Sequence, residues 1–390
     1  MRVAHVITRL IVGGAQENTI ASVLGLQQKP GLEVSLISGA SAGPEGSLAG
    51  AFDQSPNSLY LLPDLVRPVH PWKDLLAWRG LVRIFRAQRL DIVHTHSGKA
   101  GILGRLAAHR AGVPIIIHTI HGPSFGPFQG PLANAVFRSA ERRAGKVTTH
   151  FVAVADAMIR QYLAAGIGRP GQYSKIYSGF SLLPFLSAAN DPTLRARFGL
   201  SPENIVVGKI ARLFKLKGHE DLFRVAPDLI RDCPQIRFLL VGDGPWRGRF
   251  ERQARALHLE NHFVFSGLVP PAEVPGLVGI MDVLVHLSLR EGLARALPQA
   301  LAAARPVVAY DCDGAGEVCR DNETGFLLCP GDLSGLRERL ARLAADAALR
   351  ERLGRQGREF VRQHFAVETM VDDLFALYLK LANASRMPPS

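Results

Sequence analysis

Long hydrophobic runs, cysteine and tryptophan are all scarce in this sequence. Of its 390 residues, four are cysteine and three are tryptophan. No stretch approaches the roughly 18 apolar residues that a membrane span needs, and the opening Met-Arg-Val-Ala-His-Val-Ile resembles a strand rather than a signal peptide. Cys233, Cys312, Cys319 and Cys329 follow no metal-ligand spacing, which indicates free thiols in a reducing compartment. We therefore expect a cytoplasmic protein.

Acidic residues are also fewer than basic ones. The chain has 34 Asp and Glu against 46 Lys and Arg, which gives a formal charge of +12. This excess favours anionic partners such as nucleotide phosphates, nucleic acid or an acidic lipid surface. Because the sequence has no nucleic-acid motif and no aromatic series for base stacking, we expect no nucleic-acid partner. The length and the 47% hydrophobic content predict two domains with buried cores.

Short apolar strands alternate with helices along most of the chain. The polar stretch 181–202 contains three prolines and predicts a hinge between two such regions. Strand, helix and strand in this order predict an α/β fold with parallel sheets, in which ligands bind outside the carboxyl ends of the strands. The predicted strands are 3–8, 33–37, 91–94, 115–120, 205–210, 238–241, 263–267, 283–287 and 307–309.

The stretch 280–309 places a Glu-Gly turn at such a strand end. A buried strand at 283–287 precedes Glu291 and Gly292, and a helix is predicted from about Leu293 to Ala304. Glycine lets a ligand approach the backbone, and glutamate offers two acceptor oxygens to hydroxyl groups. Taken alone, the pair is explained more simply as a solvated loop before a helix.

Two other turns suit a phosphate-bearing ligand. Arg212 and Lys217 lie between a strand and a helix. The planar guanidinium of arginine and the compact ammonium of lysine both suit a pyrophosphate at such a position. Gly13 and Gly14 form either an anion cradle before a helix or a plain tight turn. A dinucleotide-binding domain is excluded, because there is no G-x-G-x-x-G turn and the second strand ends in Ser-Gly, with no acidic residue.

Three further features allow more than one interpretation. His94-Thr-His96 has no third ligand nearby, so we expect strand-end packing or hydrogen bonding there rather than a metal site. Asp311-Cys-Asp313 could hold a divalent ion between phosphates. The basic helix 71–89, with Trp72 on its apolar face, could lie on an anionic membrane or pack on the sheet.

In this order, the motifs resemble those of family four glycosyltransferases, which are retaining enzymes. The resemblance covers roughly residues 2–380 and includes the Glu-Gly turn, the Arg…Lys-Gly motif and Gly242-Asp-Gly-Pro. It implies the GT-B fold, in which two Rossmann-like doubly wound parallel-sheet domains face a cleft. The sequence departs from the family at Gln299, where a second glutamate is usual. Glutamine can still accept one hydrogen bond and donate another.

The resemblance also implies roles for individual residues. Glu291 and His121 would contact the donor sugar, and Arg212 and Lys217 would bind its diphosphate. Gln299 would bind the ribose hydroxyls, and the strand end at Gly267 would hold the base through backbone groups. The remaining residues implied at the donor site are Gly13, Gly14, Gly242, Gly292 and Leu293.

On this basis we expect domains at residues 1–182 and 183–365, with a helix at about 366–384 packing back on the first. The implied activity moves a hexosyl group from a nucleoside diphosphate sugar, expected to be UDP-linked, to a hydroxyl of a glycan, glycolipid or lipid-linked acceptor. Neither a metal nor another cofactor is required, and peripheral contact with an anionic membrane is conceivable. The alternatives are a nucleotide-sugar epimerase of the same fold and a non-catalytic nucleotide-sugar-binding protein.

Overall fold

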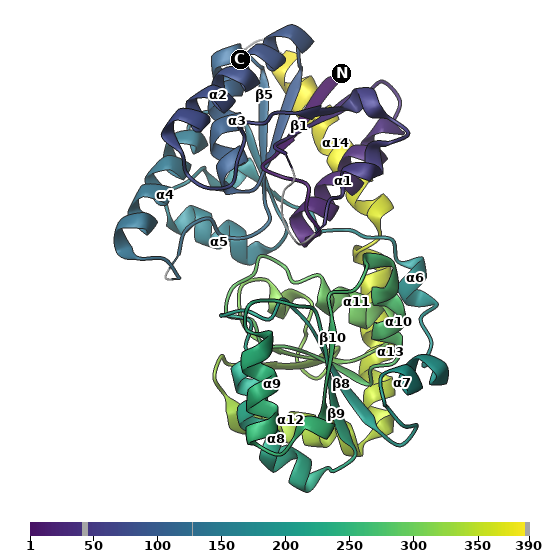
Figure 1. Ribbon diagram of the computed structural model, residues 1–390. Helices are drawn as coiled ribbons and strands as arrows, with labels where there is room; N and C mark the ends of the chain where they lie inside the picture. The colour runs from purple at the N-terminus through teal and green to yellow at the C-terminus, as the bar shows by residue number, and fades with distance from the viewer. Residues whose placement is uncertain (41–45, 127, 387–390) are drawn as a thin grey trace. The chain divides into compact units, whose positions relative to one another are not determined.

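The computed structural model describes residues 1–40, 46–126 and 128–386 and divides into two compact units (Figure 1). Unit 1 comprises Met1–Phe180 and Val367–Ser390, and unit 2 comprises Ser181–Ala366. Each unit is built on one parallel sheet with packed helices, so the predicted α/β fold with two Rossmann-like domains is confirmed. The predicted boundary after residue 182 lies close to the division at Phe180.

The sheet of unit 1 has seven strands in the order β3-β2-β1-β4-β5-β6-β7, all parallel. The strand order reverses between β1 and β4, and such a switch point is where ligands bind at the carboxyl ends of the strands. The strands are β1 (Arg2–Ile7), β2 (Glu33–Ser38), β3 (Leu59–Leu61), β4 (Ile92–His96), β5 (Ile115–Ile120), β6 (His150–Ala153) and β7 (Tyr173–Lys175).

Apolar clusters cover this sheet, one built with α1 and α14 and the other with α2 and α3. The last helix, α14, lies alongside α1, as Figure 1 shows, although it is the last element of the chain. The described helices of unit 1 are α1 (Gly14–Gln27), α2 (Pro71–Gln88), α3 (Gly98–Ala111), α4 (Pro131–Gly145), α5 (Asp156–Ala164) and α14 (Val367–Arg386), with short 3-10 turns η1 (Ala49–Phe52), η2 (Pro56–Ser58) and η3 (Pro170–Gln172).

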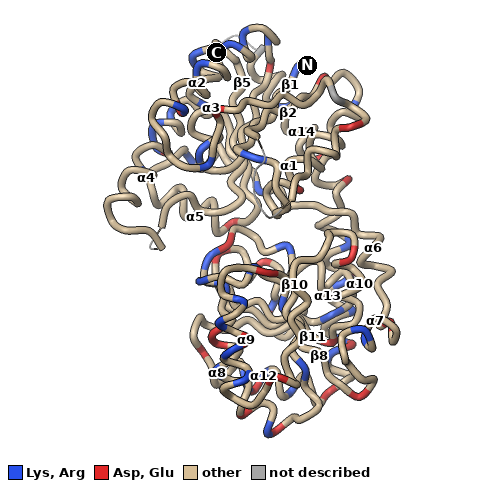
Figure 2. The backbone as a smooth tube through the Cα atoms, in the orientation of Figure 1, with Lys and Arg blue, Asp and Glu red and all other residues tan. Residues whose placement is uncertain are grey.

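Trp72, which the sequence places on the apolar face of the basic helix α2, is not buried. Ala77, Leu81 and Phe85 are buried against the neighbouring helix α3, whereas Trp72 is 64% exposed. The difference arises because Trp72 lies in the first turn of α2, ahead of the first buried residue. Lys and Arg outnumber Asp and Glu along α2 and α3, as Figure 2 shows. The helix therefore packs within unit 1 and leaves one tryptophan and a basic face exposed.

The sheet of unit 2 has six parallel strands in the order β10-β9-β8-β11-β12-β13, so its switch point lies between β8 and β11. Stacked phenylalanine rings in its core lie 4.2 Å (Phe223 and Phe263) and 4.7 Å (Phe238 and Phe263) apart between centroids. The strands are β8 (Ile205–Ile210), β9 (Ile236–Val241), β10 (Phe263–Gly267), β11 (Val283–His286), β12 (Val307–Tyr310) and β13 (Gly325–Leu328).

The helices of unit 2 depart from the predictions in two places. The predicted hinge 181–202 contains two short helices, and the helix expected from Leu293 to Ala304 spans only Ala296–Ala302 because the Glu-Gly turn extends further along the chain. The helices are α6 (Leu183–Leu186), α7 (Pro192–Arg197), α8 (His219–Asp232), α9 (Arg247–Ala256), α10 (Val274–Gly279), α11 (Ala296–Ala302), α12 (Leu333–Ala345) and α13 (Ala347–His364), with 3-10 turns η4 (Glu260–His262), η5 (Pro271–Glu273) and η6 (Ala315–Glu317).

Two expectations about the whole chain can be compared with the structure. All four cysteines are free, as predicted. Within the described ranges, no helix is both long enough and apolar enough to span a bilayer.

Candidate functional site

The loops that follow β8 and β11 are bonded to each other at the switch point of unit 2. Leu289 N–H donates to Leu216 O at 2.9 Å, and Ser288 Oγ lies 3.2 Å from the same carbonyl oxygen. Gly218 is left-handed at φ 68°, and a Cβ there would lie 2.0 Å from Leu287 O. Only glycine fits this close approach, so the fold fixes the β8 loop on the turn that carries Glu291.

This arrangement brings together two of the predicted residues, Lys217 and Glu291. Lys217 Nζ donates to Glu291 Oε1, and Ser288 Oγ donates to the same oxygen at 3.1 Å. Burial alone would raise the pKa of Glu291, but Lys217, His286 and Ser288 outweigh it and lower that pKa. Glu291 is therefore an ionised, oriented acceptor with 26% of its side chain exposed. Such a group can accept hydrogen bonds from hydroxyls of a ligand.

Asp313 shapes the same turn from the other side. Its Oδ2 accepts the backbone N–H of Glu291 at 2.8 Å, and Gly314 N–H donates to Gly292 O at 2.9 Å. Within the described part of the chain, neither Asp311 nor Asp313 belongs to a group of three side chains that could share a metal ion. Asp313 of this motif therefore contributes a carboxylate oxygen that accepts a backbone N–H of the turn.

The predicted Arg212, Gly242 and Gly267 lie at the carboxyl ends of β8, β9 and β10. Gly242 N–H donates to Gly267 O at 3.1 Å, and a Cβ on Gly242 (φ 130°) would lie 2.5 Å from Ala211 O. The two loops are thus held side by side by backbone contact. Arg212 is exposed, and its guanidinium carbon lies 5.6 Å from the Phe214 ring centroid. A basic side chain and backbone N–H groups at strand ends suit a phosphate-bearing ligand.

The other predicted residues of unit 2, Gly292, Leu293 and Gln299, differ in which of their groups a ligand can reach. Gly292 and Leu293 are buried, the latter at 8% exposure, so Leu293 can offer a ligand only its backbone. Gln299 is half-buried on α11, and its side chain makes no hydrogen bond to another described residue. Its amide group can therefore both donate to and accept from a hydroxyl.

Three buried residues near Glu291 were not predicted from the sequence. They are Lys209, His219 and His286, and we call them the lysine cluster. All three are buried, and among the described residues Lys209 Nζ and both ring nitrogens of each histidine have no hydrogen-bond partner. His286 Nε2 lies 3.9 Å from Glu291 Oε1. A lysine within the apolar strand 205–210 was the available signal, because charge inside a buried strand is unusual.

Burial sets the protonation of the lysine cluster. It lowers the pKa of Lys209 to about 7, with the charge of Lys217 as the second cause. Burial likewise lowers the pKa of His286 to about 3 and that of His219 to about 2. Both histidines are therefore neutral at pH 7, and Lys209 is poised between its two forms. A negative charge added nearby would favour the charged lysine.

In unit 1 the predicted glycines open the first helix. Gly13 precedes α1, Gly14 is its exposed first residue, and a Cβ on Gly13 would meet Gln16 Oε1 at 2.8 Å. The loops after β1 and β4 are bonded through Thr8 Oγ1 and Ser97 Oγ, which are 3.0 Å apart. The glycines therefore lie beside the switch point of this sheet, at the N-terminus of a helix.

The predicted His121 follows β5 and leads into a group of buried histidines. His121 Nε2 lies 3.0 Å from His96 Nδ1. The prediction that His94 and His96 have no third ligand nearby is wrong, because the nitrogens of His5, His94 and His96 lie within 4.8 Å of one another. His5 comes from β1, where parallel register places it opposite His94. Sequence spacing alone does not reveal that register.

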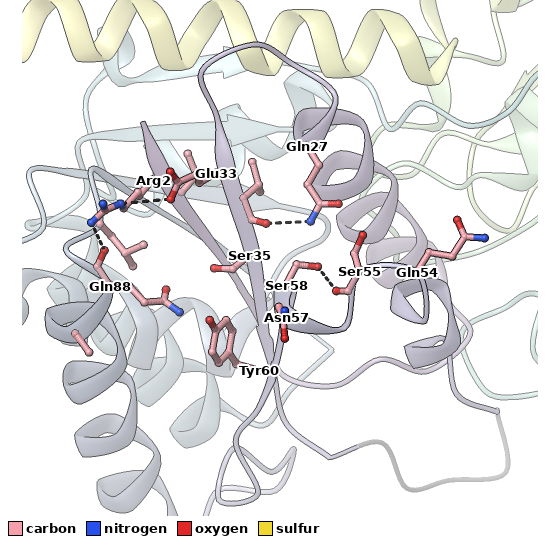
Figure 3. Close-up of a pocket in the computed structure, with 14 residues that line it drawn as sticks. Arg2, Gln27, Glu33, Ser35, Gln54, Ser55, Asn57, Ser58, Tyr60 and Gln88 are labelled. Atoms are coloured by element: carbon pink, nitrogen blue, oxygen red, sulfur yellow. Dashed lines mark hydrogen bonds and ion pairs between the residues drawn. The ribbon is translucent and has the colours of Figure 1, made fainter.

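A surface hollow of about 630 Å³ in unit 1 lies away from these residues (Figure 3). It is lined by the first residues of β1 and β2 and therefore lies at the amino ends of the strands. Arg2 pairs with Glu33 at 3.4 Å, and Gln27 Nε2 donates to Val34 O at 3.0 Å (Figure 3). Ligands of such sheets bind at the opposite ends of the strands, so we do not assign the site to this hollow.

Two family models match the chain. The model described as "Glycosyl transferases group 1" matches residues 190–360, and "Glycosyl transferase 4-like domain" matches residues 14–174. These two ranges contain all the predicted site residues except Gly13, which directly precedes the second range.

Individual proteins match over similar lengths. The UDP-Gal:alpha-D-GlcNAc-diphosphoundecaprenol alpha-1,3-galactosyltransferase of Escherichia coli is 26% identical over 98% of this chain and 97% of its own. A GDP-mannose-dependent alpha-(1-6)-phosphatidylinositol monomannoside mannosyltransferase of Mycolicibacterium smegmatis is 30% identical over 69% of this chain and 70% of its own. The crystal structure of Anabaena Alr3699/HepE with UDP and glucose has a TM-score of 0.83 at 22% identity, over 97% of this chain and 100% of the other.

Proposed function

Because this chain belongs to the group 1 glycosyl transferases, we propose that it moves a hexosyl group from a nucleoside diphosphate sugar to an acceptor hydroxyl, with retention at the anomeric carbon. The observation that carries the proposal is the charged pair of Lys217 and Glu291 at the switch point of unit 2. The pair supplies a cation for a diphosphate and an ionised carboxylate for sugar hydroxyls at one place.

The proposed step breaks the bond between the anomeric carbon and the diphosphate oxygen. The leaving nucleoside diphosphate keeps the bonding electron pair, and the acceptor oxygen forms the new bond on the same face of the sugar. The acceptor proton passes to a leaving phosphate oxygen. Arg212 and Lys217 would stabilise the charge that develops on the diphosphate, which is worth about 3 to 4 kcal/mol for one strong donor. Glu291 would orient the sugar.

The remaining predicted residues take the roles implied by the family resemblance. Gln299 would bind the ribose, the backbone at Gly267 would hold the base, and Gly242 would allow close approach of the diphosphate. In unit 1, Gly13 and Gly14 would lie against phosphates and acceptor, and His121 would contact the sugar. Unit 2 would thus hold most of the nucleotide-sugar and unit 1 would present the acceptor, with α14 belonging to the acceptor domain.

We propose UDP as the nucleotide and a lipid-linked glycan as the acceptor. The E. coli protein that matches over nearly the whole chain is named for UDP-galactose and for a diphosphoundecaprenol-linked sugar. The formal charge of +12 and the basic face of α2 suit an anionic acceptor at a membrane surface. We propose further that the reaction needs no metal and no other cofactor and that the protein works in the cytoplasm.

Calorimetric titration with UDP, GDP and ADP, each with and without magnesium, tests this proposal first. We expect metal-independent binding of UDP that weakens strongly in Lys217→Ala. Tight binding of GDP alone would reassign the base, and binding only with magnesium would contradict metal independence. Binding of none of the three would overturn the transferase assignment.

Turnover is measured next with UDP-galactose and UDP-glucose and with a diphosphoundecaprenol-linked acceptor, and the anomeric configuration of the product is read by NMR. A transferred sugar with the α configuration of the donor is the expected result. Isomerised donor without acceptor would favour the epimerase, and binding without turnover over the acceptor panel would favour a non-catalytic binding protein. Full turnover in both Glu291→Ala and Arg212→Ala would show that the site is wrongly placed.

A further inference from the structure

A series of hydrogen bonds runs from His121 into the interior of unit 1. His121 Nε2 lies 3.0 Å from His96 Nδ1, and His96 Nε2 lies 2.9 Å from His5 Nδ1. The rings are stacked, with centroids 5.2 Å apart for His121 and His96 and 5.1 Å apart for His96 and His5. His96 therefore uses one ring nitrogen toward His121 and the other toward His5.

The series continues through a tyrosine of the last helix. Tyr378 Oη lies 3.0 Å from His5 Nε2 and 2.5 Å from His94 Nδ1. At the far end, His94 Nε2 lies 2.6 Å from Thr119 Oγ1. We call this series the histidine network, and its members in order are Thr119, His94, Tyr378, His5, His96 and His121.

The interior members of the network are almost completely buried, and none is more than 4% exposed. Burial lowers the pKa of His5 to about 3 and that of His121 to about 4, and it lowers those of His94 and His96 well below the usual value. All four imidazoles are therefore neutral at pH 7. A neutral imidazole has one N–H donor and one acceptor nitrogen, so the proton position on any member dictates the positions on all the others.

Thr119 selects one of the two possible directions. Its hydroxyl is buried, and within the described ranges it has no bonding partner other than His94. A buried hydroxyl is costly to leave without an acceptor, so it donates to His94 Nε2. His94 Nδ1–H then donates to Tyr378, and Tyr378 O–H donates to His5 Nε2. Likewise His5 Nδ1–H donates to His96 and His96 Nδ1–H donates to His121.

We propose that the histidine network holds His121 as the tautomer protonated at Nδ1, and that Tyr378 is a positioning residue for His121. His121 is half-buried, and its Nδ1 makes no hydrogen bond to another described residue. That N–H is thus the group through which His121 can meet a ligand. Under the proposed function, on which this part rests, His121 donates a hydrogen bond to an oxygen of the donor sugar and does not act as a base.

A metal ion held by His5, His94 and His96 is the rival explanation of their closeness. Their ligand atoms lie within 4.8 Å of one another, but all six ring nitrogens already have hydrogen-bond partners. The rings of His94 and His96 also stack at 4.5 Å with planes 24° apart. A shared ion needs one lone pair from each ring turned toward a common point, and the hydrogen bonds use those lone pairs otherwise.

Nitrogen-15 NMR of the full chain labelled at histidine tests the proposal without any assay of activity. We expect four neutral histidines, all protonated at Nδ1, to be assigned to His5, His94, His96 and His121 by single His→Gln variants. Protonation of His121 at Nε2, or a charged member at pH 7, would overturn the proposal. Metal analysis of the purified protein accompanies the spectra, and one equivalent of zinc per chain on these residues would also overturn it.

Tyr378→Phe tests the positioning role, with Tyr173→Phe as the matched control. Tyr173 also makes a hydroxyl hydrogen bond in unit 1, to Ile167 O at 2.6 Å, but it lies outside the network. We expect Tyr378→Phe to replace the single tautomer of His121 by a mixture, while Tyr173→Phe leaves it unchanged. An unchanged tautomer in Tyr378→Phe would overturn the role of Tyr378, and the spectrum of the unmodified protein keeps the test decisive if that variant does not fold.

Kinetics then separate this inference from the proposed function. In an active transferase we expect Tyr378→Phe to lower kcat and to leave the KM of the donor nearly unchanged, because the nucleotide is bound by unit 2. A loss of His121 tautomer control with no change in kcat would refute the link to catalysis. If no transfer is found at all but the predicted tautomers are observed, the proposed function fails and the network stands.

Discussion

Both units bury polar side chains next to their parallel sheets, but the two groups differ in their hydrogen bonds and charge. In unit 1 every ring nitrogen of His5, His94 and His96 has a hydrogen-bond partner, and burial keeps the rings neutral. In unit 2 the nitrogens of the lysine cluster have none among the described residues and lie behind a charged pair. A satisfied neutral network fixes geometry, whereas unsatisfied basic groups respond to added negative charge. We therefore expect unit 1 to orient ligands and unit 2 to sense their charge.

The largest expected effect is a difference in acid stability between the units. Unit 1 has at least five histidines with lowered pKa values and unit 2 has two; they are His5, His94, His96, His118 and His121, and His219 and His286. A histidine with a lowered folded-state pKa stabilises the fold fully above the unfolded pKa of about 6.5 and loses that contribution as the pH falls toward the folded value. Each contributes a slope of about 1.4 kcal/mol per pH unit.

Urea unfolding between pH 7.5 and 4 measures the two slopes through tryptophan fluorescence. Trp246→Phe leaves only the unit 1 probes, Trp72 and Trp78, and the double variant of those two leaves only Trp246 in unit 2. We expect the free energy of unfolding to fall more steeply below pH 6.5 in unit 1. Equal slopes would contradict the idea that unit 1 is built on neutral histidines.

The second largest effect concerns the charged pair of unit 2. We expect Lys217→Ala to lower kcat roughly 100-fold to 1000-fold, since it removes a preorganised charge at the leaving group. Lys215→Ala is the control, because Lys215 lies in the same loop but is exposed. Steady-state kinetics with a saturating donor provide the measurement. Similar losses in both variants would mean that overall positive charge matters and the Glu291 pair does not.

The third effect separates backbone strain from crowding at the β8 loop. Gly218 and Gly199 have nearly the same positive φ, 68° and 66°, but only a Cβ on Gly218 would meet a neighbour, Leu287 O at 2.0 Å. We expect Gly199→Ala to lower the free energy of unfolding by about 1 kcal/mol. Gly218→Ala should lower it by about 2 kcal/mol more and should reduce turnover as well. The prediction fails if both variants unfold alike and remain equally active.

The smallest expected effect, taken over one pH unit, is the proton balance of Lys209. Its lowered folded-state pKa, about 7, means that the free energy of unfolding rises with pH from about 7 to the unfolded value near 10.5, by about 1.4 kcal/mol per pH unit. Lys209→Met should flatten this rise. It should also abolish proton uptake on nucleotide binding near pH 7.5, measured by calorimetry in buffers of different ionisation enthalpy. Uptake that persists in the variant would assign the proton to another group.

Local patterns in the sequence predicted much of the fold. The bounds of β5, β8 and β10 were predicted to the residue, because each is a largely apolar run between stretches that contain polar, glycine or proline residues. Lys217 was also predicted from local order, since it directly precedes the glycine that the turn requires, and the structure pairs it with Glu291.

Contacts between distant segments were not accessible in this way. His5 and Tyr378 are 373 residues apart and meet only because α14 returns to unit 1. Lys209 is buried because β8 is a central strand of its sheet, and no local pattern in the sequence predicts that position. The sequence also did not indicate the three-residue strands β3 and β7, because they are too short to show a period.

The return of α14 to unit 1 has a consequence for synthesis on the ribosome. Unit 2 is continuous in the chain, whereas unit 1 needs Met370, Leu374 and Tyr378 to complete its core. Residues 1–180 therefore keep part of an apolar face and two histidines uncovered until α14 has been translated. The half of the molecule that is made second can be the first to reach its native state.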